Sequence, residues 1–277
     1  MPVTTDAARL FIGGQFRAAR KVIPTFEAAT GEPLGDGPCA TEGDIDDAVV
    51  AAHSADADAW RFSATGERAE AMKRFAAALR ERAESTSELV SRENGMPITL
   101  SRAVNGAFPA ALVTYYGKLI VGSDPEEIRS SMIGHTIVRR EPVGVVGAIT
   151  PWNYPQALAV MKIAPALAAG CPIILKAAPE TALDALVFAE AAAEAGLPPG
   201  VLNVVPGDAA AGAGQPSRSG QSSVHRVHGG RPCDRRSVRP ADPASHPRPW
   251  REVGRDHPRR RRPRYDDRRL TVGVVCQ

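Results

Sequence analysis

Cysteines, which often act as nucleophiles or metal ligands, number four in this 277-residue sequence and lie far apart. The four cysteines form no CxxC pair and no metal-binding spacing, and neither His53 nor His135 has a partner at a useful spacing. We therefore expect no metal site. Scattered single cysteines are typical of a reduced compartment, which predicts a cytoplasmic protein. The cysteines are Cys39, Cys171, Cys233 and Cys276.

The candidate binding residues instead follow three apolar runs. VGVVGAI at 143–149 is continuous and rich in β-branched residues, as in a strand buried on both faces. PIILK at 172–176 and VLNVV at 201–205 have the same character, and Ala-rich segments at 156–169 and 181–195 are predicted helices. Strand, helix, strand, helix, strand predicts a right-handed, parallel, Rossmann-like βαβαβ half of a doubly wound α/β sheet.

Ligands of such sheets bind beyond the carboxyl ends of the strands. In this sequence those ends are residues 150–153, 176–179 and 206–207. The usual dinucleotide fingerprint GxGxxG is missing, because Gly144 and Gly147 lie inside the first strand and no third glycine opens the helix. The pattern alone thus predicts a ligand cleft at this edge, without saying that the ligand is a dinucleotide.

The segments before these strands supply the rest of the body. A hairpin is expected at 10–17, with Gly13 and Gly14 in its turn. Apolar residues at helical spacing, Met72, Phe75, Leu79 and Ala83, predict one buried helical face over 67–84 that continues to residue 92. The remaining expectations are helices at 44–57 and 103–118, a helix stop at 94–97, a strand–turn–strand at 131–140, and a kink or restart at Pro165.

Six short stretches in one order resemble the aldehyde dehydrogenase superfamily over residues 9–213. The PWN element and the LPPGVLNVVPG element are the most specific of them together. This resemblance, rather than any periodicity, implies binding of NAD or NADP without a glycine fingerprint. The stretches are FIGG (11–14), ENGMP (93–97), ITPWNYP (149–155), APALAAGC (164–171), ILKAAPET (174–181) and EAGLPPGVLNVVPG (194–207).

The resemblance implies oxidation of an aldehyde to a carboxylic acid in two stages. A cysteine thiolate attacks the aldehyde and a hydride leaves to the nicotinamide, after which water activated by a glutamate hydrolyses the thioester. An asparagine amide with a backbone N–H stabilises the oxyanion in that family, and Asn153 matches it. On residue type alone, Asn153 would be a turn residue between strand and helix.

The resemblance also assigns cofactor-binding residues. Ile149, Thr150, Pro151 and Trp152 match the segment that lines the cofactor with Asn153, although a tryptophan here could also belong to the core. Lys176 matches a lysine at the adenosine ribose or phosphate, although a lysine at a strand end is usually only solvated. Pro179 replaces a carboxylate that grips the ribose, so the choice between NAD and NADP stays open. Gly207 completes the set.

Charge divides the chain near residue 214. Residues 1–214 contain 18 basic and 25 acidic residues, whereas residues 215–277 contain 16 arginines, no lysine and 6 acidic residues. The second segment also lacks Ile, Phe, Met and Asn, so it cannot bury enough apolar surface to offset the entropy of ordering. We expect two parts: a cofactor-binding body at 1–213, with a hairpin arm near 124–142, and a disordered basic tail at 214–277.

The tail also carries a hidden pattern. When its codons are regrouped, taking the last two bases of each with the first of the next, residues 216–235 permit HPGVDKVAFTGSTAAGRAI and residues 247–264 permit LxLGGKSAAIILDDVDL. Both runs resemble the family's continuation in order and spacing, although position x permits no glutamate. We infer a one-base frameshift near 211–215, which makes the arginine run 259–262 a misread acidic stretch.

Two other functions stay open at this stage. The tail taken at face value could bind nucleic acid or acidic surfaces through its arginines, but it has little aromatic interleaving. A non-catalytic cofactor-binding module is the third possibility. The preferred prediction is an aldehyde dehydrogenase fragment without its catalytic cysteine and base glutamate: inactive, poorly soluble, with weak or lost cofactor binding and an incomplete oligomerisation arm. No membrane partner is expected, and the aldehyde is not specified.

Overall fold

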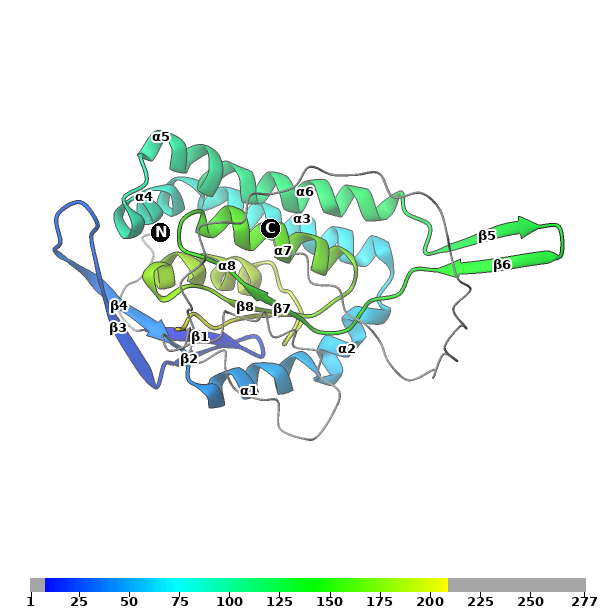
Figure 1. Ribbon diagram of the computed structural model, residues 1–277, viewed down its shortest axis with the longest axis horizontal. Helices are drawn as coiled ribbons and strands as arrows, with labels where there is room; N and C mark the ends of the chain where they lie inside the picture. Colours follow the sequence, from blue (N-terminus) through cyan, green and yellow to red (C-terminus); the bar gives the residue numbers. More distant parts are fainter. Residues whose placement is uncertain (1–7, 209–277) are drawn as a thin grey trace, which may run out of the picture. The chain divides into compact units, whose positions relative to one another are not determined.

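The computed structural model describes residues 8–208 of the chain. A five-stranded sheet lies at the centre, with strand order β2-β1-β9-β8-β7. Its three last strands are parallel, and the helices that connect them cover the sheet (Figure 1). These are β7 (Val146–Ile149), α7 (Pro155–Ala168), β8 (Ile173–Lys176), α8 (Ala182–Glu194), which follows a short 3-10 turn η2 (Pro179–Thr181), and β9 (Leu202–Val204). The predicted strand–helix alternation and parallel sheet are confirmed.

Alternate residues of the sheet face two different hydrophobic clusters, as the period of two in a strand requires. Ile173 and Leu175 pack into the larger cluster, under α7 and α8 and the helices behind them. Ile174 points the other way, into a smaller cluster with Val145 and Val205. The helix α1 (Glu42–Ala52) covers that second face through Ala48 and Ala52. The sheet is therefore the middle layer between two helical layers.

The strand β7 differs from its prediction. We expected burial on both faces, but Ile149 is 47% exposed and Gly147 is exposed. The reason lies in the strand order, because β7 is the edge of the sheet among residues 8–208 and has β8 as its only strand partner there. The β7 edge therefore has backbone groups free to pair with a further strand.

The N-terminal hairpin forms as expected and also extends the sheet. Gly13 and Gly14 both have positive φ, 62° and 78°, as the turn between β1 (Arg9–Ile12) and β2 (Gln15–Ala18) requires. Phe11 pairs antiparallel with Val204 of β9, a contact that the sequence did not indicate. A second hairpin, β3 (Lys21–Phe26) with β4 (Pro33–Cys39), was likewise not predicted.

Two predicted helices are divided in the structure. Instead of one helix at 44–57, α1 begins earlier because Thr41 and Asp44 form a capping box, and Ser54 caps a new helix, α2 (Ala55–Phe62). Instead of one helix from 67 to 92, α3 (Thr65–Glu81) and α4 (Ala83–Asn94) meet at Arg82, whose φ and ψ are −92° and 0°. The predicted stop is confirmed, because Gly95 adopts φ 75°.

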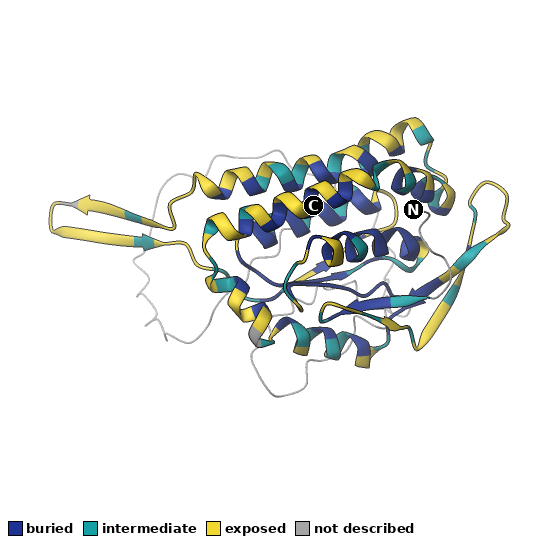
Figure 2. Ribbon diagram, turned by 180° about the vertical axis from the view of Figure 1, so that it is seen from behind, coloured by how far each residue is buried: buried dark blue, intermediate teal, exposed yellow. Residues whose placement is uncertain are grey.

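The third predicted helix begins earlier than residue 103 and changes pitch. It comprises α5 (Ile98–Ser101), a π-helical segment η1 (Arg102–Ala107) and α6 (Phe108–Val121). Gly106 lies against α4 in this segment, where a Cβ would stand 2.3 Å from the Ser87 hydroxyl. The helix α7, in contrast, runs through Pro165 without the restart that was one expectation. Figure 2 shows the inner faces of these helices buried and their outer faces exposed.

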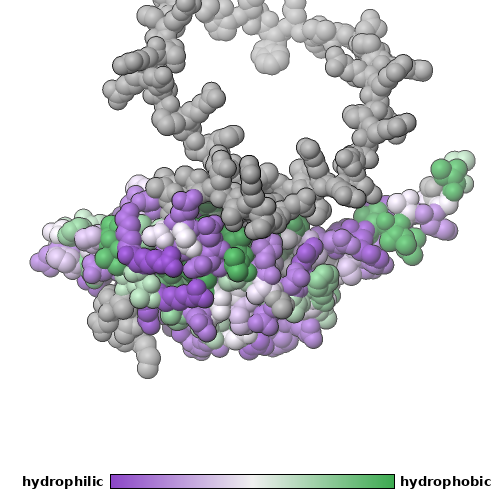
Figure 3. All heavy atoms as spheres, turned by 90° about the horizontal axis from the view of Figure 1, so that it is seen from below, coloured by the Kyte–Doolittle hydropathy of each residue, from purple (hydrophilic) through white to green (hydrophobic). Residues whose placement is uncertain are grey.

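The predicted strand–turn–strand is a hairpin of β5 (Glu126–Ser131) and β6 (Gly134–Arg139). Its first strand begins before the predicted residue 131. The hairpin extends away from the helices and the sheet in Figure 1, and its exposed apolar residues are visible as green surface in Figure 3. Met132 and Ile133 at its turn are fully exposed. The predicted disordered tail, with Cys233 and Cys276, lies outside the described residues.

Candidate cofactor-binding edge of the sheet

The carboxyl ends of the parallel strands are joined by backbone hydrogen bonds beyond the strands themselves. The Thr150 N–H donates to the carbonyl of Lys176 at 3.1 Å, and the Gly207 N–H donates to the carbonyl of Ala177 at 3.1 Å. Three residues that sequence reasoning placed at a ligand cleft, Thr150, Lys176 and Gly207, therefore lie at one edge of the sheet. Thr150 and Gly207 are buried and Lys176 is half-buried, so buried residues form the base of this edge.

Lys176 places a positive charge at this edge. Its Nζ donates to the carbonyl oxygen of Gly207 at 2.5 Å, which fixes the end of the side chain above β9. Burial lowers the pKa of Lys176 from its ordinary value, and the nearby acidic groups, Asp208 and Glu180 among them, oppose that change. Of the two residues near the missing family carboxylate, Pro179 is half-buried in η2 and Glu180 is exposed.

The segment between β7 and α7 forms the exposed rim of the edge. Pro151, Trp152 and Asn153 are exposed, with Trp152 at 51%, and this exposure argues against a core role for the tryptophan in this part of the chain. Pro155 is the first residue of α7, where its fixed φ suits a helix start. The N–H groups at a helix N-terminus attract negative charge. Asn153 therefore lies where a side-chain amide and oriented backbone dipoles adjoin one another.

Asn94 and the pair Lys21–Asp208 also belong to this edge, and sequence reasoning did not identify any of the three. The Asn94 Nδ2 donates to the carbonyl of Trp152 at 3.1 Å, which ties the end of α4 to the rim. The Lys21 ammonium lies 3.0 Å from the Asp208 carboxylate, and this hydrogen bond raises the pKa of Lys21. These contacts join residues 58 and 187 positions apart, so no local spacing could have indicated them.

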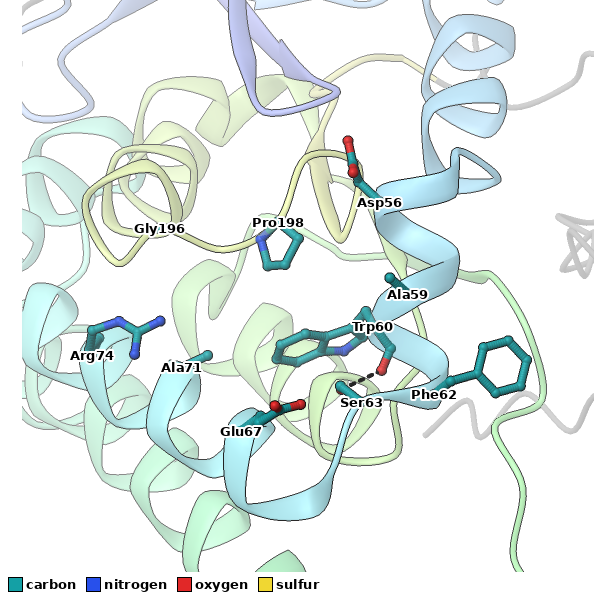
Figure 4. A pocket seen from close by; sticks show the side chains of 10 residues that line it. All are labelled: Asp56, Ala59, Trp60, Phe62, Ser63, Glu67, Ala71, Arg74, Gly196 and Pro198. Carbon is teal, nitrogen blue, oxygen red and sulfur yellow. Dashed lines mark hydrogen bonds between the residues drawn. The ribbon is translucent and has the colours of Figure 1, made fainter.

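Two other features of residues 8–208 do not form part of this edge. Cys171 is buried, and burial raises the pKa of its thiol, as in a structural cysteine rather than a nucleophile. The hollow in Figure 4, about 550 Å³, lies between α2, α3 and the loop before β9, and Trp60, Glu67 and Arg74 are among its lining residues. None of the predicted cofactor residues lines it, so it is a separate feature.

Within residues 8–208, no helix combines the length and apolarity needed to cross a membrane. No group of three or more His, Cys, Asp or Glu side chains in that range could hold a metal ion. The free cysteines in that range, Cys39 and Cys171, are both buried.

Comparison with known proteins shows which family this chain is similar to. The aldehyde dehydrogenase family model matches residues 16–217. A geranial dehydrogenase of Castellaniella defragrans is 45% identical over 226 residues, covering 80% of this chain and 47% of that protein. The Mycobacterium tuberculosis aldehyde dehydrogenase complexed with NAD⁺ matches with a TM-score of 0.70 and 42% identity, covering 74% of this chain and 43% of that one.

A third relative carries both ligands of the reaction. The aldehyde dehydrogenase C mutant of Pseudomonas syringae, in complex with NAD⁺ and octanal, matches with a TM-score of 0.69 and 33% identity, covering 74% of this chain and 42% of that one. The chain thus spans about half the length of the curated relatives that it matches.

Proposed function

Because the chain belongs to the aldehyde dehydrogenase family, we propose that its residues 9–213 form the NAD(P)-binding portion of an enzyme that oxidises an aldehyde to a carboxylic acid. The observation that carries the proposal is the edge itself. Thr150, Lys176 and Gly207 converge there through backbone hydrogen bonds, and the Trp152–Asn153 rim borders them. Parallel sheets bind nucleotides at this position.

The chemistry of the donor set fits a dinucleotide. The Lys176 ammonium suits a ribose hydroxyl or a phosphate oxygen, and the start of α7 adds oriented N–H groups that favour an anion. The exposed, apolar side chains of Ile149 and Trp152 offer a surface for a flat ring. We assign cofactor contacts to Ile149, Thr150, Pro151, Trp152, Asn153, Lys176, Pro179 and Gly207. The cofactor, when bound, supplies the hydride acceptor.

In this proposal Asn153 holds the oxygen of the aldehyde as negative charge develops on it. Asn153 is exposed at the rim, two residues before the start of α7, so its amide can donate a hydrogen bond outward to the aldehyde oxygen. No residue in 8–208 is assigned as the nucleophile, because Cys39 and Cys171 are both buried. In this proposal the nucleophilic cysteine lies outside residues 8–208, and position x of the regrouped run corresponds to the general-base glutamate.

We propose that a one-base frameshift near residues 211–215 interrupts the family's reading frame. The family match ends at residue 217, close to this position. The second support is the β7 edge. A doubly wound sheet of order 3-2-1-4 puts its fourth strand beside the first, which here is the open side of β7. The regrouped codons supply VAFTG, an apolar and β-branched run suited to that place.

Removing one base within codons 211–215 is therefore expected to create an enzyme, with slow hydrolysis of its thioester because position x permits no glutamate. The product of the altered gene should reduce NAD⁺ or NADP⁺ with octanal or geranial, the aldehydes named for two relatives, whereas the chain as written should give no rate above background. The measurement is absorbance of the reduced cofactor at matched protein concentrations. If the present gene product turns over at the rate of its altered counterpart, the frameshift proposal is wrong.

Cofactor binding by the product of the altered gene tests the site separately from catalysis. Replacing Lys176 by alanine is expected to weaken NAD⁺ or NADP⁺ binding by about 10- to 100-fold, because a charged hydrogen bond contributes ~1.5–3 kcal/mol. Isothermal titration measures the change, with Lys118→Ala on the exposed side of α6 as the matched control. Equal affinities for the two variants would remove Lys176 from the site.

The remaining assignments are proposals of the same kind. The β5–β6 hairpin, with Met132 and Ile133 bare at its turn, is proposed as part of an oligomerisation arm. A cofactor-binding module without catalysis is the outcome if titration succeeds while the altered gene gives no activity. Nucleic-acid binding by the arginine-rich tail has no observation in residues 8–208 to favour it. The cytoplasmic location stays a prediction from the cysteine pattern.

A further inference from the structure

Two carboxylic acids to which the proposed function assigns no role are buried together behind the rim. Both oxygens of Glu93, at the end of α4, accept backbone N–H groups of α8, from Leu183 and Asp184, each at 2.9 Å. The Gln156 amide of α7 donates to the backbone carbonyl of Asp184 at 2.7 Å and to its carboxyl at 3.2 Å. The exposed fraction is 7% for Glu93, 1% for Asp184 and zero for Gln156. We call these three residues the acid cluster.

Each member of the acid cluster adjoins one segment of the candidate site. Glu93 precedes Asn94, whose side chain holds the Trp152 carbonyl. Gln156 is in the first turn of α7, directly after the Trp152–Asn153 rim. Asp184 is in the first turn of α8, after the η2 turn that follows Lys176. The acid cluster therefore joins the rim to the segment that carries Lys176.

Charge in the acid cluster has no cation to neutralise it among the described residues. Arg92 on α4 pairs with Glu27 at the surface at 3.1 Å, and Glu180 on η2 is exposed. The neighbouring α7 contributes the neutral Gln156, and Arg102 on η1 pairs with Glu84. Three polar atoms around Asp184 have no hydrogen-bond partner: its Oδ2, the Gln156 Oε1 and the Thr181 Oγ1. A protonated Asp184 would have acceptors available, whereas two ionised carboxylates would repel each other.

Burial favours the protonated forms. It raises the pKa of Glu93 to about 8 and raises that of Asp184, on which the Glu93 charge acts in the same direction. A carboxyl group whose pKa is higher in the folded than in the unfolded state stabilises the fold fully below its ordinary value of 4.5. That stabilisation is lost as the pH rises through about 8.

Building on the proposed cofactor site, we propose that the acid cluster is a positioning device. It fixes the position of the Trp152–Asn153 rim relative to the Lys176 segment while at least one carboxyl group is protonated. When both groups ionise, their repulsion separates the starts of α7 and α8, and the rim loses its fixed position. Glu93, Gln156 and Asp184 act through the rim and do not touch the cofactor. The cofactor affinity therefore falls at alkaline pH.

Hydrogen exchange of the full chain at about pH 5 to 9.5, followed by mass spectrometry without cofactor, tests the device. After correction for the intrinsic rate, protection of the peptides covering 150–156 and 176–184 is expected to fall about tenfold per pH unit as the pH rises towards about 8 in the unaltered chain. Asp184→Asn, which keeps the shape and cannot ionise, is expected to lessen this decline, because Glu93 alone still titrates. Glu81→Gln, an exposed acid on α3, serves as the control and should follow the unaltered chain.

A second variant guards against misfolding of the first. Glu93→Gln keeps one acceptor oxygen, so protection should be lower at acid pH but should decline less as the pH rises, because Asp184 alone still titrates. Protection that is independent of pH in the unaltered chain, or an unchanged decline in both variants, would overturn the proposal.

NAD⁺ titration over the same pH range separates this proposal from the proposed function. An absence of binding at every pH, with the expected exchange pattern, contradicts the cofactor site and leaves the acid cluster supported. Binding with the same pH profile in the unaltered chain and in Asp184→Asn contradicts the acid cluster alone.

Discussion

Replacing Gly200 by alanine is expected to lower the free energy of unfolding by about 3 kcal/mol or more. Gly200 has φ 81°, a left-handed conformation that costs other residues ~1–2 kcal/mol. An added Cβ would also stand 2.1 Å from the carbonyl oxygen of Ala51, in the last turn of α1. That contact is with backbone, so the whole end of α1 must move, at a further cost of ~1–3 kcal/mol. Urea unfolding followed by circular dichroism measures the loss.

A matched glycine separates the clash from the backbone strain. Gly196 has φ 64°, and an added Cβ would meet no heavy atom within 4 Å. Gly196→Ala should therefore show only the conformational cost of ~1–2 kcal/mol. Equal losses for the two variants would mean that α1 does not press against Gly200 in solution.

Replacing Asn153 by alanine, in the protein made from the gene with one base removed, is expected to reduce kcat by about 10²–10³-fold. Loss of one oxyanion donor costs ~2.7–4 kcal/mol of transition-state stabilisation, and nothing in the fold replaces the Asn153 amide. The side chain is exposed, so the free energy of unfolding should change by no more than about 0.5 kcal/mol. Steady-state rates with octanal at saturating cofactor give the comparison.

Tyr154→Phe, in the same exposed segment, provides the control for local disturbance and should keep kcat within about twofold. Cofactor affinity should be similar in both variants, because the lost interaction forms as the aldehyde oxygen becomes charged. An Asn153→Ala enzyme with undiminished kcat would exclude the oxyanion role. Loss of cofactor affinity with unchanged kcat would instead make Asn153 a cofactor-binding residue only.

The parallel core could be predicted because its strands carry a strong local signal. PIILK and VLNVV are short, mostly apolar runs flanked by Ala-rich helices, and only one simple topology joins them. The antiparallel addition of β1 rests on a register of Phe11 with Val204, which no local pattern encodes. The strand β4 contains Gly35 and Gly37 and begins with Pro33, all poor strand formers, so its pairing with β3 depends on tertiary context.

The candidate site divides in the same way. Topology brings the ends of β7, β8 and β9 together, so Thr150, Lys176 and Gly207 could be placed from the strand order. Asn94 and the acid cluster could not, because Glu93 contacts α8 from 90 residues away. The exposure of Ile149 was missed for a different reason: a continuous apolar strand looks the same whether its outer edge is paired or open.

The open edge of β7 also has a consequence during synthesis on the ribosome. A ribosome adds about 5–20 residues per second, so the segment proposed to pair with β7, about 20 residues beyond β9, would follow it by about one to four seconds. During that interval the nascent sheet presents the β7 edge to any other strand nearby. Under the proposed frameshift, the present frame does not encode that segment. The β7 edge would then stay open after synthesis, and we expect chaperones and proteases to act on such a chain.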